Sequence, residues 1–225
     1  YVGKATQQTR IIPDKELWNI PLLFAYLRKK SMISEQILAI LQRHIQTYDE
    51  KCSNDYLIVF TTGKRHNPDF CEITFNFYNY WHLLGCETAS EDAFLTYKNC
   101  KNYQDVSKDI NLLYGLSTFY RKERTFEQVF DFVKKAKSVR LGYTTIGPEQ
   151  YQLTMAIGNS IGIIGYDFPK SNARRFMIPK TCQEKSLRMV TNESKKILFI
   201  LSKESGHKIY DRIEYEITKD LSKEF

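Results

Sequence analysis

A strand-like segment that leads directly into a short helix and then meets a glycine constrains the fold more than any other part of this chain. The segment is Cys71–Cys86, CEITFNFYNYWHLLGC. Its first half alternates apolar and polar residues as a half-buried strand does, and Gly85 is placed to end the helix that follows. We expect His82 in the first turn of that helix, just after a strand. Histidine is the side chain that exchanges a proton near neutral pH, so His82 is a candidate for chemistry.

The predicted elements run from helices at the start of the chain to antiparallel strands at its end. Gly158-Asn159 is a strong hairpin-turn signal between two of the strands. This order predicts an α+β fold, an antiparallel sheet flanked by helices. The predicted helices are Asn19–Lys30, one that starts near Ser34, Ser90–Lys98, Asp105–Tyr114 and Thr125–Lys137. The predicted strands are Tyr56–Thr61, Phe70–Phe77, Val139–Thr145, Tyr151–Ile157, Ile161–Phe168, Ile197–Ser202 and Arg212–Ile217.

A polar junction at Asp49–Asn54 divides the chain into two predicted parts. Residues 1–50 would be a helical appendage, and residues 51–225 would be the α+β domain. The two helices of the appendage fit a helix-turn-helix, or a helical hairpin packed on the main domain or on a partner. The hairpin is the preferred interpretation, and it also offers a surface for a homodimer.

Composition narrows the class of protein. The 33 Lys and Arg outnumber the 26 Asp and Glu and give a net charge of +7, which favours a polyanionic partner but also fits an ordinary basic protein.

The five cysteines form no C-x-x-C pair, so we expect free thiols and a reducing cytoplasm. No apolar run approaches the roughly 20 residues of a membrane span. No His or Cys pair has ligand spacing, and no nucleotide-binding glycine motif is present, so we expect neither a metal nor a cofactor.

A metal-independent ribonuclease fits what remains. Such an enzyme needs a base for the 2′-OH proton, an acid for the leaving oxygen, and cations that hold the phosphorane charge. The segment from Lys170 to Lys208 contains ten Lys and Arg against three acids, with Tyr166 and Phe168 nearby for base stacking. A solvated basic loop remains the alternative. Acidic residues for a two-metal nuclease, Glu72, Glu214 and Glu216, form a weaker pattern.

The segment Asn79–Gly85, NYWHLLG, resembles the N-aromatic-x-H-L-x-G signature of a phage-borne branch of the barnase–EndoU–colicin–RelE-like nuclease superfamily. Further similarities follow in order over roughly residues 51–218. They are the aromatic Phe126, Phe130 and Phe132, the hairpin Tyr151–Gly165, the tripeptide Met177-Ile178-Pro179 and the strand Ile197–Lys203.

The resemblance implies a domain with a small antiparallel sheet flanked by helices. It also implies that this domain cleaves RNA without metal and is of phage or mobile-element origin. By this analogy His82 is an active-site acid or base. The second proton carrier stays open between Tyr166, Tyr143 and a lysine, and Ser202 is a further catalytic or phosphate-binding candidate. The candidates for nucleic-acid contacts are Asn159, Ser160, Arg174, Arg175, Lys180 and Lys203.

The resulting hypothesis is a ribonuclease that forms 2′,3′-cyclic phosphates, with RNA as substrate and an antitoxin or a target protein as a further partner. Two alternatives stay open. One is a non-catalytic nucleic-acid-binding module, and the other is a protein inhibitor of a nucleic-acid enzyme. For His82 itself the alternative is a core histidine that is satisfied by a neighbouring carbonyl.

Overall fold

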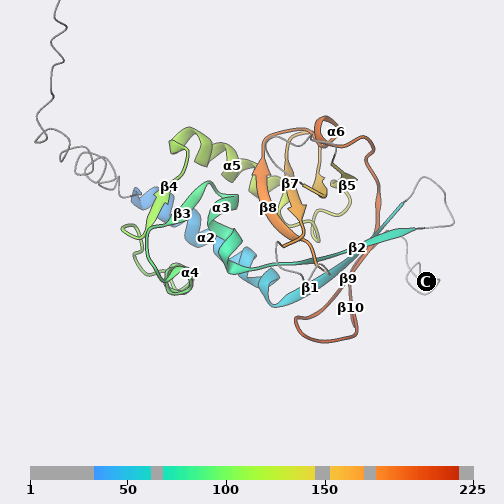
Figure 1. Ribbon diagram of the computed structural model, residues 1–225, viewed down its shortest axis with the longest axis horizontal. Coiled ribbons are helices and arrows are strands. Elements are labelled where there is room, and N and C mark those ends of the chain that lie inside the picture. Colours follow the sequence, from blue (N-terminus) through green and yellow to red (C-terminus); the bar gives the residue numbers. More distant parts are fainter. Residues whose placement is uncertain (1–32, 62–67, 145–152, 170–175, 218–225) are drawn as a thin grey trace, which may run out of the picture. The chain divides into compact units, whose positions relative to one another are not determined.

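A computed structural model of the chain describes residues 33–61, 68–144, 153–169 and 176–217, and the predicted helix Asn19–Lys30 lies outside them. The described residues form an α+β fold, as predicted (Figure 1). The helices are α2 (Glu35–Cys52), α3 (Phe77–Leu83), α4 (Ala93–Lys101), α5 (Gly115–Val129) and α6 (Leu187–Val190). The strands are β1 (Asn54–Phe60), β2 (Asp69–Thr74), β3 (Cys86–Thr88), β4 (Ile110–Leu112), β5 (Arg140–Tyr143), β6 (Met155–Gly158), β7 (Ile163–Asp167), β8 (Ile178–Gln183), β9 (Ile197–Glu204) and β10 (Arg212–Glu216).

The strands form two four-stranded antiparallel sheets and one small two-stranded sheet, rather than one sheet. The first has the order β10-β9-β1-β2, the second has the order β5-β6-β7-β8, and β3 pairs with β4. Met177, just before β8, joins the two larger sheets. Its backbone N–H donates to the Glu72 carbonyl at 2.9 Å, and its own carbonyl accepts from the Thr74 N–H at 2.9 Å. This junction places β8 next to the end of β2, from which α3 departs.

Helix α2 is an integral part of the domain. Ser34 caps it by accepting a hydrogen bond from the Ile37 N–H at 3.3 Å, and Leu41, Ile45 and Tyr48 are buried in the main core. The Tyr48 ring also stacks on Phe130 at a centroid distance of 5.3 Å. The predicted boundary at residue 50 therefore does not separate this helix from the sheets. Its apolar face is buried inside the domain and is not available to a second copy.

Two of the predicted helices differ from the structure. Asp105–Tyr114 contains strand β4, which pairs with β3, because Ile110 is buried against the core and its neighbours complete a ladder with Cys86–Thr88. Helix α5 starts ten residues before the predicted Thr125 and ends at Val129. The segment after it turns, and Asp131 there forms a buried ion pair with Lys51 at 3.1 Å. The aromatic side chains of this region, Phe126, Phe130 and Phe132, are all buried.

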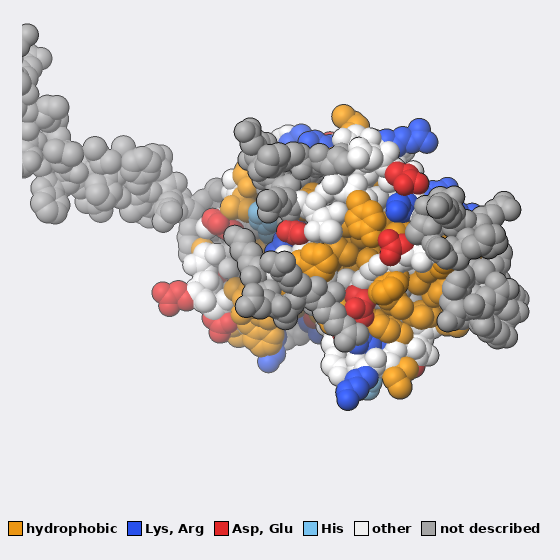
Figure 2. Space-filling model, turned by 45° about the vertical axis from the view of Figure 1, so that its right-hand side comes forward, with side chains coloured by type: hydrophobic (Ala, Val, Ile, Leu, Met, Phe, Trp, Pro, Cys, Tyr) orange, Lys and Arg blue, Asp and Glu red, His pale blue; other side chains and the backbone are white. Residues whose placement is uncertain are grey.

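The outer face of the first sheet is partly apolar. A shallow cavity of about 340 Å³ on it is lined by Leu57, Val59, Pro68, Asp69, Phe70, Phe199 and Leu201. Figure 2 shows hydrophobic side chains gathered on the face that this view brings forward. Among the described helices, none has the length and apolarity that crossing a membrane requires.

The predicted hairpin between β6 and β7 is confirmed, and its turn leaves no room for side chains at two positions. A Cβ atom at Gly158 would lie 2.2 Å from the Gly162 carbonyl oxygen, and one at Gly162 would lie 2.4 Å from Thr125 Cγ2. We expect Gly158→Ala to destabilise the protein by roughly 1–3 kcal/mol, the usual cost of overpacking. Urea denaturation measures this loss. Ser160→Ala in the same exposed turn is the control and should leave the midpoint almost unchanged.

Candidate active site

The helix that presents His82 is fixed at both ends by local sequence. Asn76 caps its start, because the Asn76 Oδ1 accepts a hydrogen bond from the Tyr78 N–H at 3.0 Å. This cap starts the helix at Phe77, so His82 lies in the last turn of the helix. The sequence had suggested the first turn. Gly85 follows with a φ of 74°, a conformation that favours glycine, and it ends the helix as predicted.

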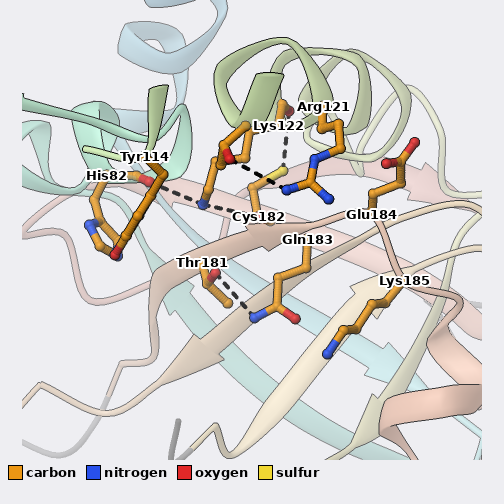
Figure 3. A pocket seen from close by; sticks show the side chains of 10 residues that line it. His82, Tyr114, Arg121, Lys122, Thr181, Cys182, Gln183, Glu184 and Lys185 are labelled. Atoms are coloured by element: carbon orange, nitrogen blue, oxygen red, sulfur yellow. Dashed lines mark hydrogen bonds between the residues drawn. The ribbon is translucent and has the colours of Figure 1, made fainter. Parts of the chain in front are cut away.

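His82 lies at the edge of a cavity of about 260 Å³ between α3, α5 and β8. Figure 3 shows His82 and Tyr114 at one end of the cavity and Lys185 at the other, with Lys122 reaching from α5 between them. Cations outnumber acids in the lining. The complete lining is His82, Tyr114, Thr118, Arg121, Lys122, Thr181, Cys182, Gln183, Glu184 and Lys185. Its one carboxylate, Glu184, lies 3.7 Å from Arg124, so the cavity is electropositive.

Lys122 ties the helix of His82 to strand β8. Its Nζ donates to the carbonyl of His82 at 3.4 Å and to the carbonyl of Cys182 at 3.1 Å. Its stem packs against Gly85, where a Cβ atom would lie only 3.0 Å from Lys122 Cδ. Burial lowers the pKa of the Lys122 ammonium below its ordinary value of 10.5. The ammonium is therefore held beside His82 without a carboxylate partner among the described residues.

His82 is exposed to the cavity, so the alternative of a buried core histidine is wrong. Partial burial of the imidazole lowers its pKa below the ordinary value of 6.5, and the positive charges of Lys122 and Lys180 lower it further. All three causes disfavour the imidazolium. The lowered pKa favours the neutral ring, which is the form that accepts a proton.

Three of the predicted site residues lie in the interior. Tyr166 is fully buried, and its hydroxyl has no hydrogen-bond partner within the described part of the chain. Ser202 is also fully buried, and its hydroxyl donates to the Glu214 carboxylate at 2.5 Å. Lys203 is 3% exposed and donates to the His207 carbonyl at 2.6 Å. None of the three lines the His82 cavity, and we give them no role in the proposal below.

The remaining predicted residues fall in three places. Lys180 on β8 is close enough to His82 to lower its pKa. Asn159 and Ser160 line a different cavity, at the turn between β6 and β7. Arg174 and Arg175 lie outside the described residues.

Sequence reasoning missed most of the cations in the cavity. Arg121 and Lys122 lie on the first half of α5, which the predicted helix left out, and Lys185 follows β8, a strand that was not predicted. A signal was present for α5, because its buried residues Phe119, Glu123 and Phe126 repeat at helical spacing. Only the tertiary contact of α5 with α3 and β8 brings these cations to His82.

One group of potential metal ligands forms in the described part of the chain, away from His82. It consists of His44, Glu123 and Glu127. Arg43 forms ion pairs with both acids, since its Nη2 lies 2.9 Å from Glu123 Oε1 and 2.8 Å from Glu127 Oε1. The arginine thus supplies the positive charge that a metal ion would bring, and we propose no metal there.

The cysteines are all free. Cys86, one turn after His82 in sequence, is buried, and burial raises the pKa of its thiol to about 12. Burial raises the pKa of Cys182 to about 12 as well, although this residue borders the cavity. Both thiols stay protonated at neutral pH and are inert packing groups rather than nucleophiles.

An exposed histidine in a cationic cavity, presented by an α+β fold with antiparallel sheets, fits a protein that acts on phosphate-bearing substrates. Comparison with known families identifies it further. Residues 40–219 match PBECR4, the phage-Barnase-EndoU-ColicinE5/D-RelE like nuclease 4 family, and the chain belongs to this family. The predicted superfamily is thereby confirmed, and the membership supports a nuclease function in general. Neither the curated proteins nor the solved structures include a match to this chain.

Proposed function

We propose that this chain is a metal-independent ribonuclease that cleaves RNA by transesterification in the His82 cavity. The observation that supports the proposal best is an exposed imidazole, His82, in the same cavity as an ammonium group, Lys122, which two backbone carbonyls, one of them that of His82, hold in place. A two-metal mechanism needs several carboxylates around the ions. The described lining of the cavity offers only Glu184, which is already paired with Arg124.

The reaction uses the substrate's own 2′-hydroxyl as the nucleophile. The neutral imidazole of His82 takes the 2′-OH proton while the 2′-oxygen attacks phosphorus. The P–O5′ bond then breaks and leaves a 2′,3′-cyclic phosphate on one fragment. The Lys122 ammonium stabilises the charge on the phosphorane oxygens. Because burial lowers its pKa, Lys122 is also our candidate for the group that protonates the leaving 5′-oxygen.

The other side chains of the cavity fit RNA binding. Arg121 and Lys185 are exposed cations at a distance from His82 along the cavity, suited to neighbouring phosphates. Tyr114 is 57% exposed beside His82 and offers a ring on which an unpaired base stacks. The five free thiols fit a reducing cytoplasm, where we place the enzyme. An antitoxin that blocks this cavity remains a prediction.

The test is an incubation of the purified chain with total cellular RNA in excess EDTA, followed by analysis of the fragment ends. We expect cleavage that EDTA does not reduce, with 2′,3′-cyclic phosphate at the new ends. DNA of the same sequence should stay intact, because it lacks the 2′-hydroxyl. Cleavage that requires added Mg²⁺ would overturn the mechanism. Salt-sensitive binding of RNA without any product would support a non-catalytic binding module instead.

A further inference from the structure

A second cavity, of about 720 Å³, lies beyond the end of β8 and is lined almost entirely by polar side chains. Its lining comprises four serines, Asn159, and the two arginines Arg140 and Arg188, with Leu187 as the single apolar member. No carboxylate lines it among the described residues. Hydroxyl, amide and guanidinium groups around one space are the donors that bind phosphate oxygens.

The two arginines are available to a ligand. Both are exposed, and neither forms an ion pair with a residue that the structure describes. Other arginines of the domain are engaged, such as Arg43 with Glu123 and Arg124 with Glu184. These two guanidinium groups, which have no acidic partner among the described residues, can therefore bind an anion in the cavity.

The cavity is held by rigid backbone. Arg140 begins edge strand β5, where it pairs with Gly158 directly before the β6–β7 turn. In that turn the Asn159 side chain accepts hydrogen bonds from the Ile161 N–H at 2.8 Å and the Gly162 N–H at 3.1 Å. The Asn159 carbonyl in turn accepts from the Leu187 N–H at 2.8 Å, which fastens the segment of Arg188 to the turn.

A small core cluster holds the segment of Leu187 against strands β6 and β7. Leu187 and Val190 of α6 pack with Ala156 of β6 and Ile163 of β7, and all four side chains are buried. The backbone that carries the donors is thus fixed before any ligand arrives, which lowers the entropic cost of binding.

Consecutive residues of the chain line the His82 cavity and the second cavity. Gln183, Glu184 and Lys185 line the first cavity, and the next three residues, Ser186 to Arg188, line the second. Three residues of extended chain span at most about 11 Å. A few nucleotides of single-stranded RNA therefore reach from one cavity into the other.

We propose that the second cavity binds a backbone phosphate of the same single-stranded RNA whose scissile linkage lies beside His82, with Arg140 and Arg188 as its main ligands. This inference rests on the proposed function, because it assumes that the scissile linkage of the RNA lies beside His82. It implies that the enzyme contacts its RNA substrate several nucleotides away from the linkage that is cut.

Binding of fluorescein-labelled 2′-O-methyl RNA, measured by anisotropy over a series of salt concentrations, tests the proposal. The methyl group blocks the nucleophile, so the probe stays intact. Two single-stranded probes, of about four and about twelve nucleotides, cover the range of a typical single-strand site. For Arg140→Gln/Arg188→Gln we expect roughly tenfold weaker binding of the longer probe, the fold-change that one charge-assisted hydrogen bond supplies. The salt slope should also fall by about 0.7, the value for one phosphate of a single strand.

A matched control removes the same charge elsewhere. Lys98→Gln/Lys108→Gln neutralises two exposed cations outside both cavities, and it should leave both probes almost unaffected. Equal losses in the two double variants would show a general charge effect and would overturn the proposal. A loss on the short probe as large as that on the long one would also overturn it, since the cavity would then bind a phosphate unconnected to the first cavity.

The outcome separates this inference from the proposed function. If the chain binds the longer probe through Arg140 and Arg188 but cleaves no RNA, the binding site stands and the catalytic proposal fails. If the wild type cleaves RNA, and the double variant binds both probes and cleaves unmodified RNA of both lengths like the wild type, the second cavity has no role and the catalytic proposal stands.

Discussion

Replacement of His82 by alanine is expected to lower the rate of RNA cleavage by about 10²–10⁴-fold, the contribution of a positioned general base. The side chain is exposed to the cavity, and no described residue depends on its ring for a hydrogen bond, so the protein should stay folded. Single-turnover cleavage of a defined RNA measures the rate. Circular dichroism and the urea midpoint check the fold.

His207→Ala is the matched control for this substitution. His207 is exposed and lies 3.5 Å from Glu204 in the turn after β9, outside both cavities. Its loss should leave cleavage within about twofold of the wild type, since surface changes away from a site act weakly. Undiminished cleavage by a folded His82→Ala variant would remove His82 from the mechanism and leave the cavity without a base.

Local signals in the sequence were sufficient for the segment that presents His82. A strand pattern, an asparagine cap and a glycine with positive φ are all encoded within Cys71–Cys86, and only the position of His82 within the helix was misjudged. The β6–β7 hairpin was likewise predictable, because the residues Gly158 and Asn159 determine its turn through nearest neighbours.

The partners of His82 were not predictable, because they depend on long-range packing. Lys122 reaches the site only since α5 packs on β8, and β8 itself is placed by the backbone hydrogen bonds of Met177 to β2. Ser202 and Lys203 were misplaced for the same reason. The family resemblance made them candidates, but both are buried and donate hydrogen bonds within the domain, to Glu214 on β10 and to the His207 carbonyl.

Replacement of Lys122 by methionine is expected to lower cleavage by about 10²–10³-fold, the usual cost of losing one preorganised donor to transition-state charge. Methionine keeps most of the stem that packs against Gly85 but removes the ammonium beside His82. Lys98→Met on the exposed face of α4 is the control and should cleave like the wild type.

The pH profile distinguishes a chemical role of Lys122 from a merely structural one. In the wild type, burial and the charges of Lys122 and Lys180 hold the pKa of His82 below 6.5, so cleavage should rise with pH along an acid limb whose midpoint lies below that value. Lys122→Met removes one of the two charges that disfavour the imidazolium. The pKa of His82 must then rise, and the acid limb should move to higher pH. A drop in rate with an unmoved acid limb would contradict the electrostatic contact between the two side chains.

Lys122→Arg separates the two tasks that we assign to the ammonium. Arginine keeps the positive charge but is effectively never deprotonated in proteins, so it stabilises the phosphorane without giving its proton to the leaving 5′-oxygen. If Lys122 only stabilises charge, the arginine variant should recover much of the rate that the methionine variant loses. If Lys122 is also the acid, both variants should remain slow with an ordinary 5′-oxygen leaving group. A substrate whose leaving group is a phenolate departs without a proton, and on it the arginine variant should approach the wild-type rate.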